Sequence, residues 1–375
     1  MKKNPPIPRA EARRKGLKMP PKYRQIADSL FAQIRSNYRP GDKLPGEVEL
    51  AEAFGVHVMT VREAMKILQD GGVIQRKSAT GTVVLNPMGG KWVAILSELD
   101  LFSPLNNAIF HQHLVYHLRR GLMAHGLPSR ISIGSIELDQ DSSISTCFDF
   151  WADVEADRLS GLVALSTIPV IGWLDKLVRR GTPVVGTASQ YPSWVSFDEC
   201  AAYTKVFRRL ATLGRKKTAW LGWLGSTPSH AHPINRLLKE ITAATGAEFK
   251  PEHIIGNIHP MLPRAGQIQM RKIFSEKKLP VEVVLIADEN LLHDALVELE
   301  LRNISIPDDV ILICGRSAGN PHIPIDDRII YVDHAPLAFA NGMVEALMRQ
   351  IEGGEIKQGE TRIEPLITWG TKGWD

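Results

Sequence analysis

The sequence predicts an α/β protein with a small N-terminal α+β unit and a larger region of parallel sheets. Three observations lead to this prediction. Apolar residues between positions 22 and 70 recur at helical spacing, and two short β-rich runs follow them. From residue 92 onward, short apolar runs alternate with helical patterns, as in parallel sheets covered by helices. Residues 1–90 carry 16 Lys and Arg against 8 Asp and Glu, whereas the remainder has a net charge of −4.

The composition is that of a globular protein with more than one domain. The length of 375 residues exceeds that of a typical domain, and 44% apolar and 23% charged residues are ordinary values. No apolar run reaches the ~18 residues of a membrane helix, and the N-terminus lacks the apolar stretch of a signal peptide. Cys147, Cys200 and Cys314 are far apart and odd in number, which favours reduced thiols. We therefore expect a cytoplasmic protein that contacts no membrane.

The basic charge of the N-terminal region has two explanations. Residues 1–19 are rich in Pro, Arg and Lys without apolar periodicity, and they predict a disordered basic arm. This arm alone holds seven of the basic residues, so a solvated tail could account for much of the asymmetry. The other explanation is that residues 1–90 bind a polyanion.

Three helices and a hairpin are expected after the arm. Apolar residues from Tyr23 to Ile34 fall on one helical stripe, and a turn at residues 39–42 ends it. Gly55 is suited to end a second helix and the pair Gly71 and Gly72 to end a third. The elements expected are helices over 23–34, 46–54 and 58–70, and strands over 73–77 and 82–85 around a turn at 78–81.

This order of elements is that of a winged helix-turn-helix, in which the third helix enters a DNA major groove. The side of that helix opposite its apolar stripe carries Arg62, which can bind guanine or phosphate, and Lys66, which suits phosphate. A solvated position is the alternative for each cation taken singly. The residues expected to bind DNA are His57, Val58, Met59, Thr60, Arg62, Lys66, Arg76, Lys77, Thr80 and Gly81.

The same region resembles a known family of DNA-binding domains. The segments 44–51 (LPGEVELA), 60–65 (TVREAM) and 81–84 (GTVV) are similar to the GntR family, and the resemblance covers 22–86 without a gap. It implies a DNA-binding domain over residues 20–86.

Individual positions within this resemblance agree with the family or depart from it. Thr60 and Arg62 stand where the family contacts DNA, whereas Val48 and Val58 replace usual arginines. His57 stands where Ser or Thr is usual, and Ala79 where Gly is usual at the wing tip. The missing arginines are expected to weaken phosphate and guanine contacts and to change the operator core.

The remaining residues, 92–375 after a linker at 87–91, predict a binding module. The sequence has no GxGxxG, Walker lysine or GxSxG motif, so we expect neither enzymatic activity nor a cofactor. His113 and His117 have a spacing that can hold a metal, but no carboxylate accompanies them and we expect no metal site. Strands are expected at 93–96, 131–136, 161–165, 183–186, 218–222, 283–287, 310–314 and 329–332, and helices at 107–125, 170–180, 201–213, 234–245, 264–276, 289–302 and 335–352.

A second resemblance covers this region. Residues 280–315, which include PVEVVLIADE and ISIPDDVILICG, are similar to the effector domain of the LacI/GalR family, and weaker similarity spans about 91–373. It implies a periplasmic-binding-protein-like pair of α/β lobes that dimerises and binds a ligand between the lobes. We expect the chain to cross between lobes near 197–200, 315–318 and 348–354. The combination of both domains is similar to arabinose-responsive repressors.

The expected ligand site rests on this resemblance. Asp288 matches the family's ligand-binding acid, and its carboxylate can accept two sugar hydroxyls; the alternative is a helix N-cap. Aromatic side chains can stack on a flat ligand, although each one singly is more often part of the core. The residues expected to bind the effector are Phe102, Tyr191, Trp194, Trp223, His230, His232 and Asp288.

These patterns predict a dimeric transcriptional regulator. Each head would read one half-site of double-stranded operator DNA, and a small molecule such as a sugar would control that binding, by default to relieve repression. The alternative is a small-molecule sensor that acts through protein partners and has a weak or vestigial DNA-binding head.

Overall fold

The structure is a computed structural model, which describes most of the chain. The described residues are 21–77, 81–85, 91–97, 101, 109–133, 148–165, 173–225, 232, 234–275, 279–323, 325–353 and 359–370.

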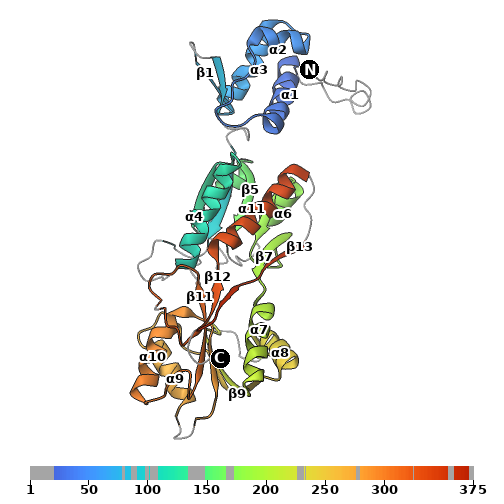
Figure 1. Ribbon diagram of the computed structural model, residues 1–375. Helices are drawn as coiled ribbons and strands as arrows, with labels where there is room; N and C mark the ends of the chain where they lie inside the picture. The colour runs from blue at the N-terminus through green and yellow to red at the C-terminus, as the bar shows by residue number, and fades with distance from the viewer. Residues whose placement is uncertain are drawn as a thin grey trace. The chain divides into compact units, whose positions relative to one another are not determined.

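The chain divides into two compact units (Figure 1). The first comprises Met1–Val93 with Leu122–Pro128, and the second comprises Ala94–Gly121 with Ser129–Asp375. Among the described residues, no helix has both the length and the apolar character needed to cross a membrane.

The first unit contains the expected three helices and hairpin. Leu30, Val61, Met65 and Ile74 are buried together, so the helical stripes and the hairpin share one apolar core. The expected order of elements is confirmed. The elements are α1 (Lys22–Asn37), α2 (Glu47–Phe54), α3 (Val58–Asp70) and the antiparallel strands β1 (Ile74–Lys77) and β2 (Gly81–Val84).

Local signals in the sequence explain where α2 and α3 end and begin. Gly55 has a left-handed backbone (φ 61°), and its N–H donates to the carbonyls of Ala51 and Glu52. Such a C-cap favours glycine, because a side chain strains this conformation. His57 caps α3, since its Nδ1 accepts the backbone N–H of Met59 at 3.3 Å. The turn between the two helices is therefore fixed by its own residues.

The second unit is built on two six-stranded sheets. Their strand orders are β13-β7-β6-β5-β3-β4 and β14-β12-β11-β10-β8-β9. In the second of these sheets β8, β10, β11 and β12 pair in parallel, and β14 pairs antiparallel to β12. The predicted parallel sheets are confirmed. The strands are β3 (Trp92–Ser97), β4 (Ser129–Ile133), β5 (Leu159–Ala164), β6 (Val184–Gly186), β7 (Ser193–Phe197), β8 (Lys217–Leu221), β9 (Glu248–Ile255), β10 (Val283–Ile286), β11 (Ile311–Ser317), β12 (Ile330–His334), β13 (Gly359–Ile363) and β14 (Leu366–Thr368).

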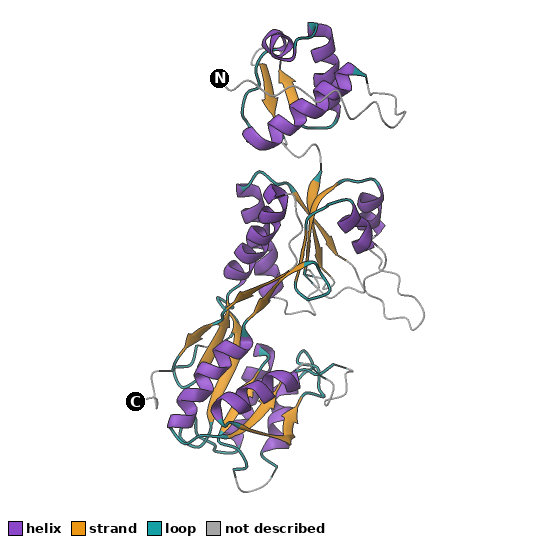
Figure 2. Cartoon of the chain, turned by 90° about the vertical axis from the view of Figure 1, so that its right-hand side faces the viewer, coloured by secondary structure: helices purple, strands orange, loops and turns teal. Residues whose placement is uncertain are grey.

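Helices cover both faces of the sheets (Figure 2). Along β10, Val284 and Ile286 belong to one apolar core, whereas Val283 and Leu285 belong to the core on the opposite face. Because both faces are buried, the strand reads as a continuous apolar run. The helices are α4 (Ile109–Ala124), α5 (Phe148–Glu155), α6 (Trp173–Arg179), α7 (Glu199–Thr212), α8 (Ile234–Thr245), α9 (Ala265–Ile273), α10 (Leu292–Leu301), which a 3-10 turn (Glu289–Leu291) precedes, and α11 (Pro336–Gly353).

The chain passes between the two sheets three times, and two of the expected crossings are wrong. The first joins β7 to α7, as expected near 197–200. The second joins β12 to α11 rather than lying at 315–318, because the chain after β11 returns to the same sheet as β12. The third joins β13 to β14 rather than lying at 348–354, where α11 still packs on the first sheet and Gln350 bonds the backbone of Val184.

Candidate DNA-binding surface and ligand pocket

Helix α3 has one buried and one exposed side. Val61, Ala64, Met65 and Leu68 are buried in the core of the first unit. On the other side Lys66 is exposed, and Arg62 and Met59 leave about half of their surfaces open (51% of the Arg62 side chain and 52% of Met59). Thr60 is half-buried, and Val58 packs partly against the core. The expected DNA-binding side of the helix is therefore accessible to a groove.

Glu47 connects the cations of this surface. The Nε and Nη2 atoms of Arg62 both lie 3.0 Å from Glu47 Oε2, and Arg76 of β1 pairs with the other carboxylate oxygen. The side chain of Glu47 is 19% exposed, so the pairs are partly shielded from water. One carboxylate thus holds guanidinium groups from α3 and the hairpin next to α2. Sequence patterns gave no sign of this role for Glu47, which lies within the segment 44–51 that resembles the GntR family.

The other residues expected to bind DNA belong to the segment 76–81. Lys77 ends β1 and pairs in register with Gly81, the first residue of β2. Thr80 lies outside the described residues.

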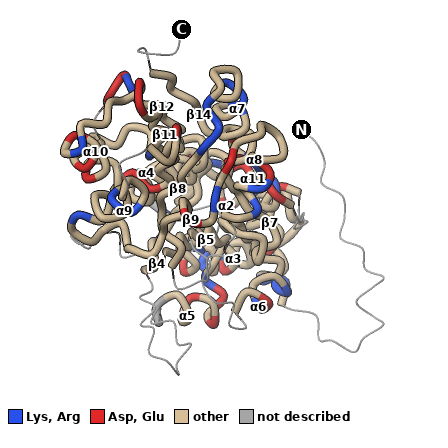
Figure 3. The backbone as a smooth tube through the Cα atoms, turned by 90° about the horizontal axis from the view of Figure 1, so that it is seen from below, with Lys and Arg blue, Asp and Glu red and all other residues tan. Residues whose placement is uncertain are grey.

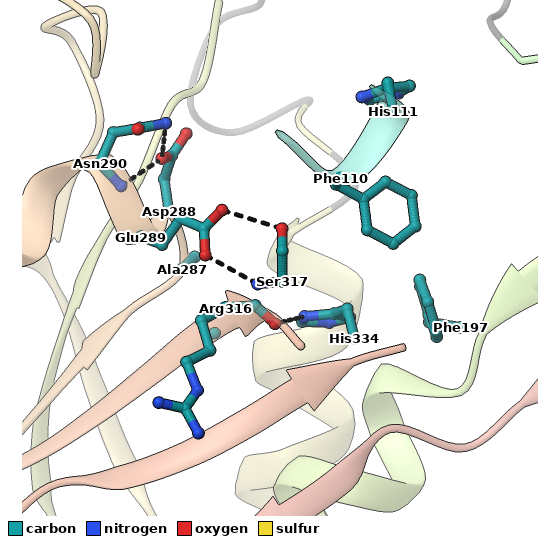
Figure 4. A pocket seen from close by; sticks show the side chains of 11 residues that line it. Phe110, His111, Phe197, Ala287, Asp288, Glu289, Asn290, Arg316, Ser317 and His334 are labelled. Carbon is teal, nitrogen blue, oxygen red and sulfur yellow. Dashed lines mark hydrogen bonds between the residues drawn. The ribbon is translucent and has the colours of Figure 1, made fainter. Parts of the chain in front are cut away.

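A pocket of about 300 Å³ opens in the second unit, where several chain segments converge. One wall is formed by residues that follow β10 and by the ends of β11 and β12; the other comes from the start of α4 and the end of β7. Ligands bind at such carboxyl ends in parallel sheets. The lining residues are Phe110, His111, Phe197, Ala287, Asp288, Glu289, Asn290, Gly315, Arg316, Ser317 and His334 (Figure 4).

Two adjacent carboxylates contribute to the first wall. Asp288 Oδ1 accepts the backbone N–H of Asn290 at 3.0 Å and its side-chain amide at 2.9 Å. Asp288 therefore caps the 3-10 turn and also lines the pocket, so the N-cap alternative and the pocket position coexist. Glu289 accepts the N–H and hydroxyl of Ser317 at 2.7 and 2.8 Å, and the amide of Asn320 at 2.9 Å. These donors are neutral and leave the negative charge of Glu289 uncompensated.

Arg316 is the cation of this wall, and it is already paired. Its Nε lies 2.5 Å from Asp333 Oδ1, and its guanidinium lies 3.8 Å from the ring centroid of Tyr331. Figure 4 shows the guanidinium directed away from Asp288 and Phe110. Among the described lining residues, Asp288 and Glu289 thus line the pocket as carboxylates, whereas the Arg316 guanidinium is paired with Asp333.

Phe110 and Phe197 supply the aromatic rings of the opposite wall, and His334 contacts Phe197 from the first wall. The rings of Phe197 and His334 have centroids 4.8 Å apart, and Phe110 lies 5.8 Å from Phe197. His334 Nε2 lies 2.7 Å from Glu199 Oε1. Burial lowers the pKa of His334, but the hydrogen bond and the charge of Glu199 outweigh burial and raise the pKa above its usual value. Burial alone lowers the pKa of His111.

The other residues expected to bind the effector lie elsewhere. Tyr191 is buried, and with Trp194 it lines a separate cavity of about 590 Å³. Trp223 is 40% exposed and contacts His259 edge-on, with 5.0 Å between the ring centroids. His232 accepts the N–H of Ile234 at 3.2 Å, near the start of α8. Phe102 and His230 lie outside the described residues. Of the expected effector-binding residues that the structure describes, Asp288 alone lines the pocket.

Sequence comparison identifies the first unit. Residues 22–84 match the family model for bacterial regulatory proteins of the gntR family. Over 94 residues the chain is 36% identical to the histidine utilization repressor of Klebsiella aerogenes, covering 25% of this chain and 38% of that protein. Over 65 residues it is 43% identical to the mannosyl-D-glycerate transport/metabolism system repressor MngR of Escherichia coli K12, covering 17% and 27%. The matched part thus spans well under half the length of either relative.

Structure comparison relates most of the chain to LacI-family regulators. A regulatory protein of the LacI family from Chloroflexus aggregans has a TM-score of 0.58 at 14% identity, covering 75% of this chain and 98% of that one. The complex of the transcriptional regulator CelR with cellobiose has a TM-score of 0.57 at 16% identity, covering 95% and 100%. At these identities the likeness concerns the fold. This chain therefore carries a GntR-type DNA-binding domain at residues 22–84 and, beyond it, the fold of LacI-family regulators.

Proposed function

We propose that the chain is a transcriptional regulator that binds operator DNA as a homodimer, and that a small ligand in the second unit controls this binding. The observation that carries the proposal is the exposed side of α3, where Arg62 and Lys66 stand opposite a fully buried stripe. Such a helix can enter a major groove while its other side stays in the core. In the second unit, acidic and basic residues are interspersed along the chain (Figure 3).

The ligand that best suits the pocket is uncharged and rich in hydroxyl groups, such as a sugar. Among the described residues, no hydrogen bond reaches Asp288 Oδ2, so this oxygen is free to accept ligand hydroxyls. Phe110 and Phe197 offer apolar surface to the flat side of a sugar ring. An anionic ligand would meet Asp288 and Glu289, while Arg316 is occupied by Asp333. The cellobiose bound by CelR supports the same class of ligand.

Ligand binding would act on the conformation of the second unit through residues at its crossings. Phe197 ends β7 at the first crossing, and His334 ends β12 at the second. Both line the pocket and their rings contact each other, so a ligand touches two crossings at once. A ligand that prefers one arrangement shifts the population toward it, and a coupling of ~1–3 kcal/mol is enough for regulation.

DNA binding is tested by footprinting the protein on the DNA upstream of its own gene and by titrating duplex affinity against salt. Real phosphate contacts give a steep salt dependence, and Arg62→Ala weakens binding. A shallow slope that Arg62→Ala leaves unchanged would support the alternative, a sensor that acts through protein partners.

The ligand class is tested by thermal shift with neutral sugars and with the corresponding sugar acids. A bound ligand raises the unfolding temperature of the chain, and we expect this for members of the neutral set. Asp288→Asn should remove the shift, while Asp308→Asn, the same change at an exposed position outside the pocket, should retain it. Stabilisation by the acids alone would contradict the proposed class.

A further inference from the structure

Two large apolar side chains are exposed at the helix ends that would face DNA. Met59, the second residue of α3, is 52% exposed, and Val48, the second residue of α2, is 62% exposed. Their neighbour Val58 instead packs partly against the core. Arg62 connects the two positions, since its Nη1 lies 3.6 Å from Met59 Sδ and its Nε and Nη2 contact Glu47, next to Val48.

The same contacts fix the orientation of the Arg62 guanidinium. A guanidinium recognises guanine through two parallel hydrogen bonds to O6 and N7. In this structure the Nε and Nη2 atoms of Arg62 are engaged by Glu47, and Nη1 is directed at the Met59 sulfur. Guanine recognition through the outer N–H groups of Nη1 and Nη2 would not displace Glu47, but it would compete with the Met59 sulfur for Nη1. The exposed apolar side chain of Met59 is therefore a base-reading group of a different kind beside the Arg62 guanidinium.

In the major groove, the apolar group on base edges is the 5-methyl group of thymine. Residues in the first turn of a recognition helix are those that contact base edges. We propose that Met59, with Val48 beside it, reads thymine methyl groups, so that the operator half-site has thymine at the positions these side chains cover. This inference rests on the proposed DNA binding. Lys66 and Arg76 on the same surface favour a polyanion over an apolar protein partner as its occupant.

The test replaces thymine by deoxyuridine, which differs only in the missing methyl group. Duplexes that bind the full-length protein are first selected from a random library, and each thymine of the selected site is then replaced singly. At one or two positions we expect affinity to fall about four-fold, the change that corresponds to ~0.8 kcal/mol for burial of one methyl group. Met59→Ala should bind more weakly and no longer distinguish the two bases at its position.

Two variants complete the design. Val48→Ala should abolish discrimination between thymine and deoxyuridine at a second position, so that only the position read by Met59 still distinguishes them. Ile67→Ala is the matched control, because Ile67 is also exposed on α3 (38%) but lies eight residues, about 12 Å, along the helix from Met59. It should keep wild-type discrimination. Circular dichroism of each variant verifies that the helices are retained.

The outcomes separate this inference from the proposed function. Failure to select any duplex would refute DNA binding itself. Tight binding that no deoxyuridine substitution changes would overturn thymine reading while leaving the function intact. Thymine reading would likewise be overturned if Met59→Ala still distinguished thymine from deoxyuridine fully. It would also be overturned if Met59→Ala abolished binding to a protein partner but left duplex affinity unchanged.

Discussion

Lys66 represents the simplest kind of contact at the scale of single residues. It is exposed on the outer side of α3, and its ammonium group suits a phosphate. Lys66→Ala should weaken duplex binding to a similar extent for all sequences and reduce the salt slope by about one. Fluorescence anisotropy over a series of salt concentrations measures both effects. Lys22→Ala, at an exposed lysine that begins α1, should change neither; equal effects of both variants would mean that only net charge matters.

His334 predicts a pH dependence of stability. Its folded-state pKa is raised, so its pair with Glu199 contributes stability fully below the unfolded pKa of about 6.5 and loses it as pH rises through the folded pKa. His111 has a lowered pKa, so its contribution to stability has the opposite pH dependence and increases as pH rises. We therefore compare wild type with His334→Gln by urea unfolding between pH 6 and 8.5. The free energy of unfolding of wild type should exceed that of His334→Gln by less as pH rises. A difference that grows with pH would contradict this assignment.

The pocket shows how far single residues could be predicted. Asp288 was predicted because it matches the ligand-binding acid of the LacI/GalR family, close after a clear apolar strand. Ser317 and His334 were missed because the predicted strands end at 314 and 332, whereas β11 and β12 extend to Ser317 and His334. Polar residues at the ends of strands carry no apolar signal. Phe110 and Phe197 were not among the expected residues, since only the fold brings them to the pocket.

At the scale of elements, the predicted strands leave out β7, β9, β13 and β14, and three of these four share a position, whereas β7 lies inside its sheet. β9, β13 and β14 each lie at the edge of a sheet. An edge strand buries less surface, so it needs no apolar run, and β9 even contains Pro251. By contrast, β10 lies inside its sheet with both faces covered, and its apolar run was clear. Sequence patterns thus predicted the interior of the sheets better than their margins.

The connection between α2 and α3 gives a prediction for one element. Gly55 has φ of 61°, and a Cβ there would meet no atom within 4 Å, so strain alone should set the cost of Gly55→Ala. We expect a loss of about 1–2 kcal/mol in the free energy of unfolding of the first unit, measured by urea denaturation. Gly46→Ser adds a side chain at an equally open position with φ of −65° and should stabilise by a few tenths of a kcal/mol. Equal losses in both variants would argue against strain.

At the scale of the whole molecule, Phe197 should matter for coupling between ligand and DNA. It ends the strand at the first crossing and contacts His334, Phe339 and Phe110. Phe197→Ala should bring the ratio of DNA affinities with and without a stabilising ligand close to one. Phe249→Ala removes a half-buried ring that packs on Phe207, outside the pocket, and should preserve the ratio. A ratio of DNA affinities close to one in both variants would show that general destabilisation is responsible.

The carboxylate of Glu47 has a consequence for how such a protein would search a genome. Because Arg62 and Arg76 already hold an internal counter-ion, a passing phosphate gains less from either than from an unpaired arginine. In the proposed regulator this would shorten residence on random DNA and would speed the sampling of successive sites.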